Sequence, residues 1–247
     1  MAANNLANDM LLTDISAADL EKDRKLLLDV GKEAGKIALT YFNADNRVWT
    51  KSGESPVSQA DYAVDKFLRE TLLAERSDYG WLSEETEDDY SRLKSQTVFV
   101  VDPIDGTRGF LEGSLKWCVS IAIVFKGRPL VGVLDCPAMG ETYSAAFGQG
   151  SILNDKKLFL QTKREIKTIT GSKKLNTVMR QHYPNTLEVL EYIPSLAYRI
   201  AMVAADRVDG GIARAGANDW DLAAADIILS EAGGFMTDPF NLSLIHI

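Results

Sequence analysis

Cysteine and histidine are scarce in this chain of 247 residues, which contains two of each. Cys118 and Cys136 are too few for a disulfide framework and lack the spacing of a zinc site. His182 and His246 give a phosphohistidine or Ser-His-Asp mechanism little to draw on. No apolar run approaches the ~20 residues of a membrane span, and the first residues do not resemble a signal peptide. We therefore expect a protein of the reducing cytoplasm.

Positive charge is in deficit, because 27 Lys and Arg stand against 35 Asp and Glu, for a net charge of −8. An acidic surface repels phosphate backbones, so nucleic-acid binding is not expected. Hydrophobic residues make up 46% and charged residues 25%, as in an ordinary globular protein. Acidic residues can also gather inward to hold divalent cations.

Hydrophobic periodicity predicts helices at both ends of the chain and strands in its middle. Helical spacing runs over 16–42, and Ser58 is a plausible N-cap for a second helix. The predicted strands are 97–101, 117–125, 130–134, 141–146, 157–160, 168–171 and 208–213, and later helices are expected at 198–205 and 221–232. This order favours a layered α/β or α+β architecture with two packed halves.

The most informative stretch is Asp102-Pro-Ile-Asp105-Gly106-Thr107, where an apolar strand ends in two carboxylates. Pro103 fixes one φ angle and turns the chain, so that the two aspartates can converge. Gly106 lets an anion approach its backbone N–H closely, and Thr107 adds a hydroxyl where a helical turn could begin. Carboxylates for cations beside amides for an anion suit a metal-dependent phosphatase. An ordinary turn is the alternative for this segment alone.

Two further acidic segments lie at element ends, Glu84-Glu85 after a short apolar run and Asp221 at the first turn of a helix. Alone, Glu84 could be solvated and Asp221 could merely cap its helix. Together with Asp102 and Asp105, they supply four carboxylates for two or three hard cations.

In this order, Asp61, Glu84-Glu85, Asp102–Thr107 and Trp220-Asp-Leu-Ala-Ala224 resemble the signature of the inositol monophosphatase superfamily, over about Lys22 to Asp238. The resemblance implies a five-layered αβαβα sandwich and a homodimer. We expect one domain over 1–247, with packed halves at roughly 16–165 and 166–240. It further implies a phosphomonoesterase that uses two to three Mg²⁺ ions and is inhibited by Li⁺ and Ca²⁺.

The resemblance also implies a role for each matching residue. Glu84, Asp102 and the backbone carbonyl of Ile104 resemble one metal site, and Asp102, Asp105 and Asp221 resemble a second. Asp105, Gly106 and Thr107 match positions that bind the phosphate. Asp61, Glu84 and Thr107 match the catalytic positions, with Thr107 and Asp61 orienting the attacking water.

The expected reaction is hydrolysis of a small phosphorylated metabolite, similar to inositol 1-phosphate, by metal-activated water. The segment 55–61 also resembles the branches that act on 3′-phosphoadenosine 5′-phosphate or histidinol phosphate. Arg214 could bind an anionic group of the substrate or could be an ordinary surface arginine. A haloacid-dehalogenase-type enzyme is not favoured, because two residues, not one, separate Asp102 from Asp105. A non-catalytic partner-binding role is less expected, since none of the matching carboxylates is lost.

Overall fold

The computed structural model describes residues 15–44, 48–50, 56–161, 165–213 and 216–237. Its helices are α2 (Ala17–Tyr41), α3 (Gln59–Glu75), α4 (Thr107–Leu111), α5 (Lys173–His182), α6 (Leu196–Ala204) and α7 (Asp219–Glu231), with short 3₁₀ helices η2 (Ser91–Lys94) and η3 (Pro137–Met139). Its strands are β1 (Val48–Thr50), β2 (Pro56–Ser58), β3 (Gly80–Ser83), β4 (Thr97–Asp105), β5 (Cys118–Phe125), β6 (Arg128–Cys136), β7 (Glu141–Ala146), β8 (Gly150–Leu153), β9 (Lys156–Leu158), β10 (Thr168–Gly171), β11 (Glu188–Val189) and β12 (Gly210–Ile212).

A seven-stranded sheet in the order β3-β4-β5-β6-β7-β8-β9 forms the centre of the molecule. β3 runs parallel to β4, and the other neighbouring pairs are antiparallel. Helices cover both faces, which is why β5 is apolar throughout and buried at every position. Along β5, Val119 and Ile121 face the layer of α2 and α3, whereas Cys118 and Ala122 face the layer of α6 and α7.

The packing of α7 on the sheet depends on one glycine. A Cβ atom at Gly132 would lie 2.5 Å from Ile227 Cγ2 and 2.7 Å from the carbonyl oxygen of Ala224. Since β6 carries no side chain there, the helix backbone can approach the sheet closely. This contact fixes the position of α7, whose first turn carries Asp221.

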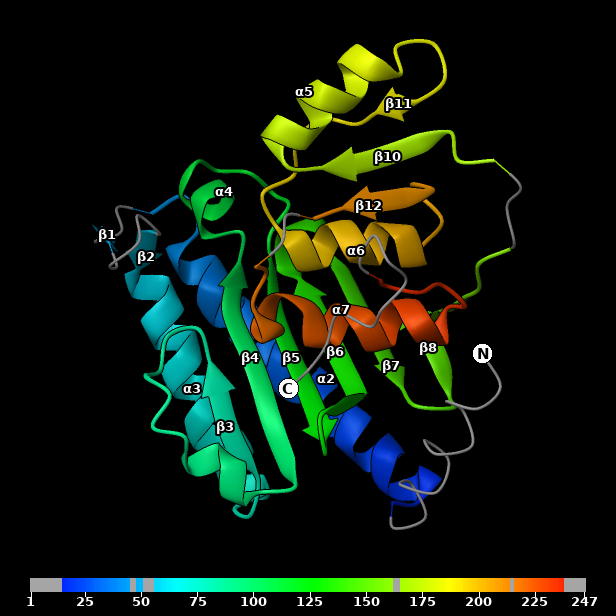
Figure 1. Ribbon diagram of the computed structural model, residues 1–247. Helices are drawn as coiled ribbons and strands as arrows, with labels where there is room; N and C mark the ends of the chain where they lie inside the picture. Colours follow the sequence, from blue (N-terminus) through cyan, green and yellow to red (C-terminus); the bar gives the residue numbers. More distant parts are fainter. Residues whose placement is uncertain (1–14, 45–47, 51–55, 162–164, 214–215, 238–247) are drawn as a thin grey trace.

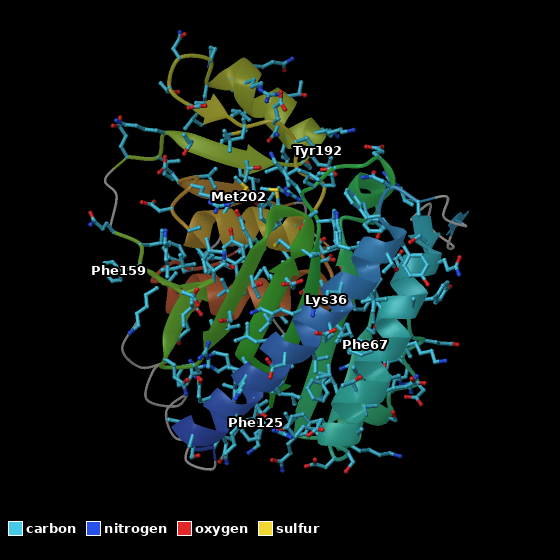
Figure 2. The ribbon with its side chains drawn as sticks, turned by 180° about the vertical axis from the view of Figure 1, so that it is seen from behind. Lys36, Phe67, Phe125, Phe159, Tyr192 and Met202 are labelled. Atoms are coloured by element: carbon cyan, nitrogen blue, oxygen red, sulfur yellow. The ribbon has the colours of Figure 1, made fainter. Side chains whose placement is uncertain are left out.

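A second, three-stranded parallel sheet in the order β11-β10-β12 lies beyond α6, and α5 covers its outer face. The layers therefore follow the order α2 and α3, central sheet, α6 and α7, small sheet, α5 (Figure 1). Seen from behind, α2 and α3 lie side by side across the central sheet (Figure 2). The expected five-layered αβαβα sandwich is confirmed. Among the described residues, no helix combines the length and apolar character needed to cross a membrane.

The structure corrects several predicted elements. β4 does not end before Asp102 but continues to Asp105, with a register shift against β5 between these two residues. The bulge keeps both aspartates in the strand while changing the direction of their side chains. β8 and α5 were not located in the sequence, and the strand predicted at 157–160 is Lys156–Leu158. The strand at 208–213 shortens to Gly210–Ile212, and the two last helices begin earlier, at Leu196 and Asp219.

Candidate metal and phosphate site

Three aspartates meet where β4 ends beside the first turn of α7. One carboxylate oxygen from each of Asp102, Asp105 and Asp221 lies within 4.8 Å of the others. We call these three residues the carboxylate cluster. Asp102 and Asp105 are buried, and Asp221 is partly buried. The fold thus brings together side chains that lie more than a hundred residues apart in the sequence.

Glu84 joins this end of the sheet from β3. Ser83 pairs with Val101 in the parallel β3–β4 ladder, and the backbone N–H of Glu84 donates to the carbonyl of Val101 at 3.2 Å. Continuing this register by one residue places Glu84 beside Asp102. Of the neighbouring charges, that of Glu84 has the largest effect on the ionisation of Asp102.

Burial and the crowding of like charges raise the pKa values of the carboxylate cluster. Burial raises the pKa of Asp102 well above its ordinary value, and the charges of Glu84, Asp105 and Asp221 raise it further. Burial also raises the pKa of Asp105, and it raises the pKa of Asp221, beside Asp105, to about 7. A group of carboxylates that resists full ionisation is one that a divalent cation would stabilise, because the cation compensates the repulsion.

The N-terminus of α6 holds Asp105 in place. Its carboxylate accepts hydrogen bonds from Ser195 Oγ at 2.5 Å, from the N–H of Ala197 at 2.6 Å and from the N–H of Leu196 at 3.2 Å. These donors oppose the effect of burial on the pKa of Asp105. Gly106 has a φ angle of 98°, and a Cβ atom there would lie 3.0 Å from the backbone nitrogen of Ser195. Only glycine fits this left-handed, closely packed position.

Thr107 and Asp61 form a direct contact between α4 and α3. The hydroxyl of Thr107 lies 3.2 Å from Asp61 Oδ1 and 3.0 Å from the carbonyl oxygen of Ile104, so it can donate to either. The other carboxylate oxygen of Asp61 accepts from the backbone N–H and the hydroxyl of Ser58, which completes a capping box for α3. Burial raises the pKa of Asp61, while these hydrogen bonds lower it.

Two supporting residues, Asp65 and Ser195, are absent from the predictions made from the sequence. Asp65, buried one turn after Asp61, accepts hydrogen bonds from the hydroxyls of Ser83 and Thr86, the latter at 3.0 Å. These hydroxyls flank Glu84-Glu85, so Asp65 fixes the segment that carries Glu84. Ser195 could have been found as an N-cap residue. Arg214 lies outside the described residues.

The donor set fits a hard divalent cation. Every side-chain ligand atom in the cluster is a carboxylate oxygen, and the carbonyl of Ile104 adds a further oxygen nearby. Mg²⁺ prefers such oxygen donors, whereas Zn²⁺ sites are usually built with histidine or cysteine. The thiol of Cys118 lies 4.0 Å from Asp105, but burial raises the pKa of this thiol well above its ordinary value. In its protonated form the thiol can donate a hydrogen bond to Asp105.

The sequence model of the inositol monophosphatase family matches residues 19–244. The chain belongs to this family. Among curated proteins, the chain is 33% identical over 218 residues to an inositol-1-monophosphatase of Rhizobium meliloti, covering 83% of this chain and 81% of the relative. It is 29% identical to a histidinol-phosphatase of Chlorobaculum parvum, covering 87% of this chain and 85% of the relative.

Solved structures agree with this membership of the inositol monophosphatase family. The IMPase of Thermotoga maritima superimposes with a TM-score of 0.81 at 25% identity, covering 90% of this chain and 87% of that one. The chain is therefore a phosphatase of this family. The two curated relatives above are named for different substrates.

Proposed function

We propose that this protein is a Mg²⁺-dependent phosphomonoesterase that hydrolyses a small phosphorylated metabolite. The observation that carries the proposal is the carboxylate cluster beside the Thr107–Asp61 contact. A phosphate monoester dianion repels an attacking oxygen, so it needs positive charge on one side and an oriented water on the other. The carboxylate cluster would hold cations that supply the positive charge, and the Thr107–Asp61 contact would orient the water.

Each residue has a distinct part in this proposal. Asp102, Asp105 and Asp221, with Glu84 and the carbonyl of Ile104, would hold the cations. Bound Mg²⁺ would neutralise the phosphate charge and lower the pKa of a water molecule. Gly106 and Thr107 begin α4, whose first backbone N–H groups are donors for a phosphate oxygen.

The Thr107 hydroxyl would donate to Asp61 and accept a hydrogen bond from the attacking water. In this relay Thr107 would pass its own proton to Asp61 and take one from the water as the bond to phosphorus forms. The hydrogen bonds from Ser58 stabilise the ionised form of Asp61, which is the form that can accept the proton. Asp61 is thus poised as a base in spite of its burial.

The substrate belongs to the same proposal. Relatives named inositol-1-monophosphatase and histidinol-phosphatase make inositol 1-phosphate and histidinol phosphate the first compounds to assay. We take a compound similar to inositol 1-phosphate as the leading candidate. From the resemblance we also propose a homodimer that is inhibited by Li⁺ and Ca²⁺.

Release of inorganic phosphate from inositol 1-phosphate and histidinol phosphate, with Mg²⁺ and with a chelator, tests this function. We expect turnover with Mg²⁺ and its loss on chelation. Ca²⁺ as the sole cation should support little turnover, since its longer bonds and looser geometry misplace the water. Equal phosphate release in the presence of the chelator would contradict a metal-dependent mechanism.

A further inference from the structure

Arg199 is a buried cation on α6 that the sequence analysis did not single out. Together with Asp221 it lines a pocket of about 530 Å³ that adjoins the carboxylate cluster. Only 7% of Arg199 is exposed. Because an arginine does not lose its proton in a protein, this side chain brings a permanent positive charge into a buried position. Burying a charge costs free energy unless opposite charges lie nearby.

Two backbone carbonyls hold the guanidinium of Arg199. Its Nε donates to the carbonyl of Ser195 at 3.3 Å, and its Nη1 donates to the carbonyl of Ile212 at 3.4 Å. Ser195 is the N-cap residue of α6 and donates through its hydroxyl to Asp105. Ile212 is the last residue of β12 in the small sheet. Arg199 is therefore tied to the turn that holds Asp105.

Asp105 and Asp221 are the acids that interact with this guanidinium. Burial lowers its pKa, whereas Asp105, Tyr192 and Asp221 raise it. In return, Arg199 lowers the pKa values of Asp105 and Asp221, against the effect of burial on these carboxyls. A neutral amide could donate to the two backbone carbonyls equally well. The hydrogen bonds therefore do not account for the charge, whereas the two neighbouring carboxylates do.

We propose that Arg199 is a positioning residue whose fixed charge sets the balance between metal binding and phosphate binding at the carboxylate cluster. This inference rests on the proposed function. A positive charge beside Asp105 and Asp221 repels a divalent cation that these carboxylates hold, and it attracts a phosphate dianion that binds to the loaded site. Arg199 therefore weakens Mg²⁺ binding and strengthens phosphate binding.

The sign of each change distinguishes this role from a purely structural one. If Arg199 only joined the N-terminus of α6 to β12, its removal would loosen Asp105 and weaken the binding of both ligands. If its charge acts on the site, removal of the charge shifts the two affinities in opposite directions, because Mg²⁺ and phosphate carry opposite charges.

Calorimetry measures both affinities at pH ~8.5, where protons compete least with Mg²⁺ for the carboxylates. Mg²⁺ is titrated into the metal-free protein, and inorganic phosphate into the protein saturated with Mg²⁺. Arg199→Gln keeps an amide donor but no charge. We expect it to bind Mg²⁺ ~10-fold more tightly and phosphate ~10-fold more weakly than the wild type. Arg199→Met, also without charge, replaces it if the buried amide prevents folding.

Two further variants complete the test. Arg199→Lys keeps the charge but loses the planar fork that bonds both carbonyls. Its melting temperature should fall, whereas both affinities should stay within a few-fold of the wild type. The matched control is Arg180→Gln on α5, because Arg180 also donates to two backbone carbonyls, those of Val189 and Leu190, but does not line the pocket. This control should leave both affinities unchanged.

The outcomes separate this inference from the proposed function. Weaker binding of both ligands by the charge-free variant, or no change in either affinity, would overturn the charge role of Arg199. Affinities of Arg199→Lys that match those of Arg199→Gln would overturn it as well, since the charge would then make no difference. A wild-type protein that binds no Mg²⁺ and releases no phosphate from inositol 1-phosphate or histidinol phosphate would instead overturn the proposed function.

Discussion

The carboxylate cluster and the neighbouring pocket of about 530 Å³, which Arg108, Lys173, Lys174 and Arg199 line, share Asp221, yet different parts of the fold create them. The carboxylates project from buried strand ends and one helix start, where burial raises their pKa values. The cations Lys173, Lys174 and Arg199 come from the first turns of α5 and α6, more than sixty residues further along the chain than Asp105. A group of buried carboxylates thus lies next to a pocket wall that carries several cations.

The largest effect is expected at Asp221, which belongs to both the carboxylate cluster and the neighbouring pocket. Asp221→Asn should lower kcat by at least ~10²-fold, because a metal ligand loses its charge. Asp219→Asn is the matched control, since Asp219 lies on the same first turn but outside the carboxylate cluster, and it should retain activity within a few-fold. Steady-state phosphate release measures both. Equal losses in the two variants would mean that only the helix dipole matters.

The next prediction separates the two roles of Asp61. Asp61→Asn keeps an oxygen that can accept from Ser58, so the melting temperature should change little. Its kcat should fall by ~10²-fold, because an amide is a far weaker base than a carboxylate. Mg²⁺ affinity, measured by calorimetry, should persist.

The matched control is Asp19→Asn, at the same position in the Ser16–Asp19 cap of α2. This variant should lose no activity, because Asp19 takes part in a helix cap but does not belong to the site. Normal turnover by Asp61→Asn would leave Asp61 with a capping role alone.

A smaller effect is expected at Asp65, which acts on the cluster only through the Glu84 segment. Asp65→Ala removes the acceptor for two hydroxyls, worth ~1–3 kcal/mol in a buried site. The Mg²⁺ concentration for half-maximal activity should rise ~10-fold, while kcat at saturating Mg²⁺ changes less. Asp65→Asn, which still offers one acceptor oxygen, should recover part of the loss. A drop in kcat that Mg²⁺ cannot restore would show that Asp65 does more than position Glu84.

The two regions differ in how far the sequence predicts them, and the reason is physical. Asp102, Asp105 and Asp221 adjoin strong strand and helix patterns, so their meeting follows from layered packing of those elements. The family resemblance then supplied their roles. Lys173, Lys174 and Arg199 carry no local signal, because a lysine or arginine is an ordinary surface residue until tertiary structure places it. The sequence pattern does not reveal α5. It also ends β4 too early, because a proline usually interrupts a strand, whereas here Pro103 lies in the bulge between Asp102 and Asp105.

Asp135 is a buried carboxylate on β6 that lies outside the carboxylate cluster. It accepts from Thr142 Oγ1 at 2.8 Å, and a Cβ atom at Gly35 of α2 would overlap with its other oxygen. Burial raises the pKa of Asp135 from 3.8 to about 6, although Thr142, Lys32 and Lys36 lower it. Asp29, Glu33 and Glu141 border the same surface hollow. Lys32 and Lys36 border it too, and among the described residues Asp135 is not part of a carboxylate group that could hold a metal ion.

Its effect on stability should therefore depend on pH and not on Mg²⁺. The folded state holds the proton of the Asp135 carboxyl more tightly than the unfolded chain does. Below pH ~4 the carboxyl is protonated in both states, so it costs the folded state no stability. As the pH rises through about 6, the folded state loses up to about 3 kcal/mol of stability through this group. Asp135→Asn, whose side-chain oxygen still accepts from Thr142, removes the titration. In urea unfolding at pH 4.5 and 7.5, the variant should gain stability relative to the wild type at the higher pH, equally with and without Mg²⁺. A gain that Mg²⁺ abolishes would place a cation at Asp135 and remove its contrast with the carboxylate cluster.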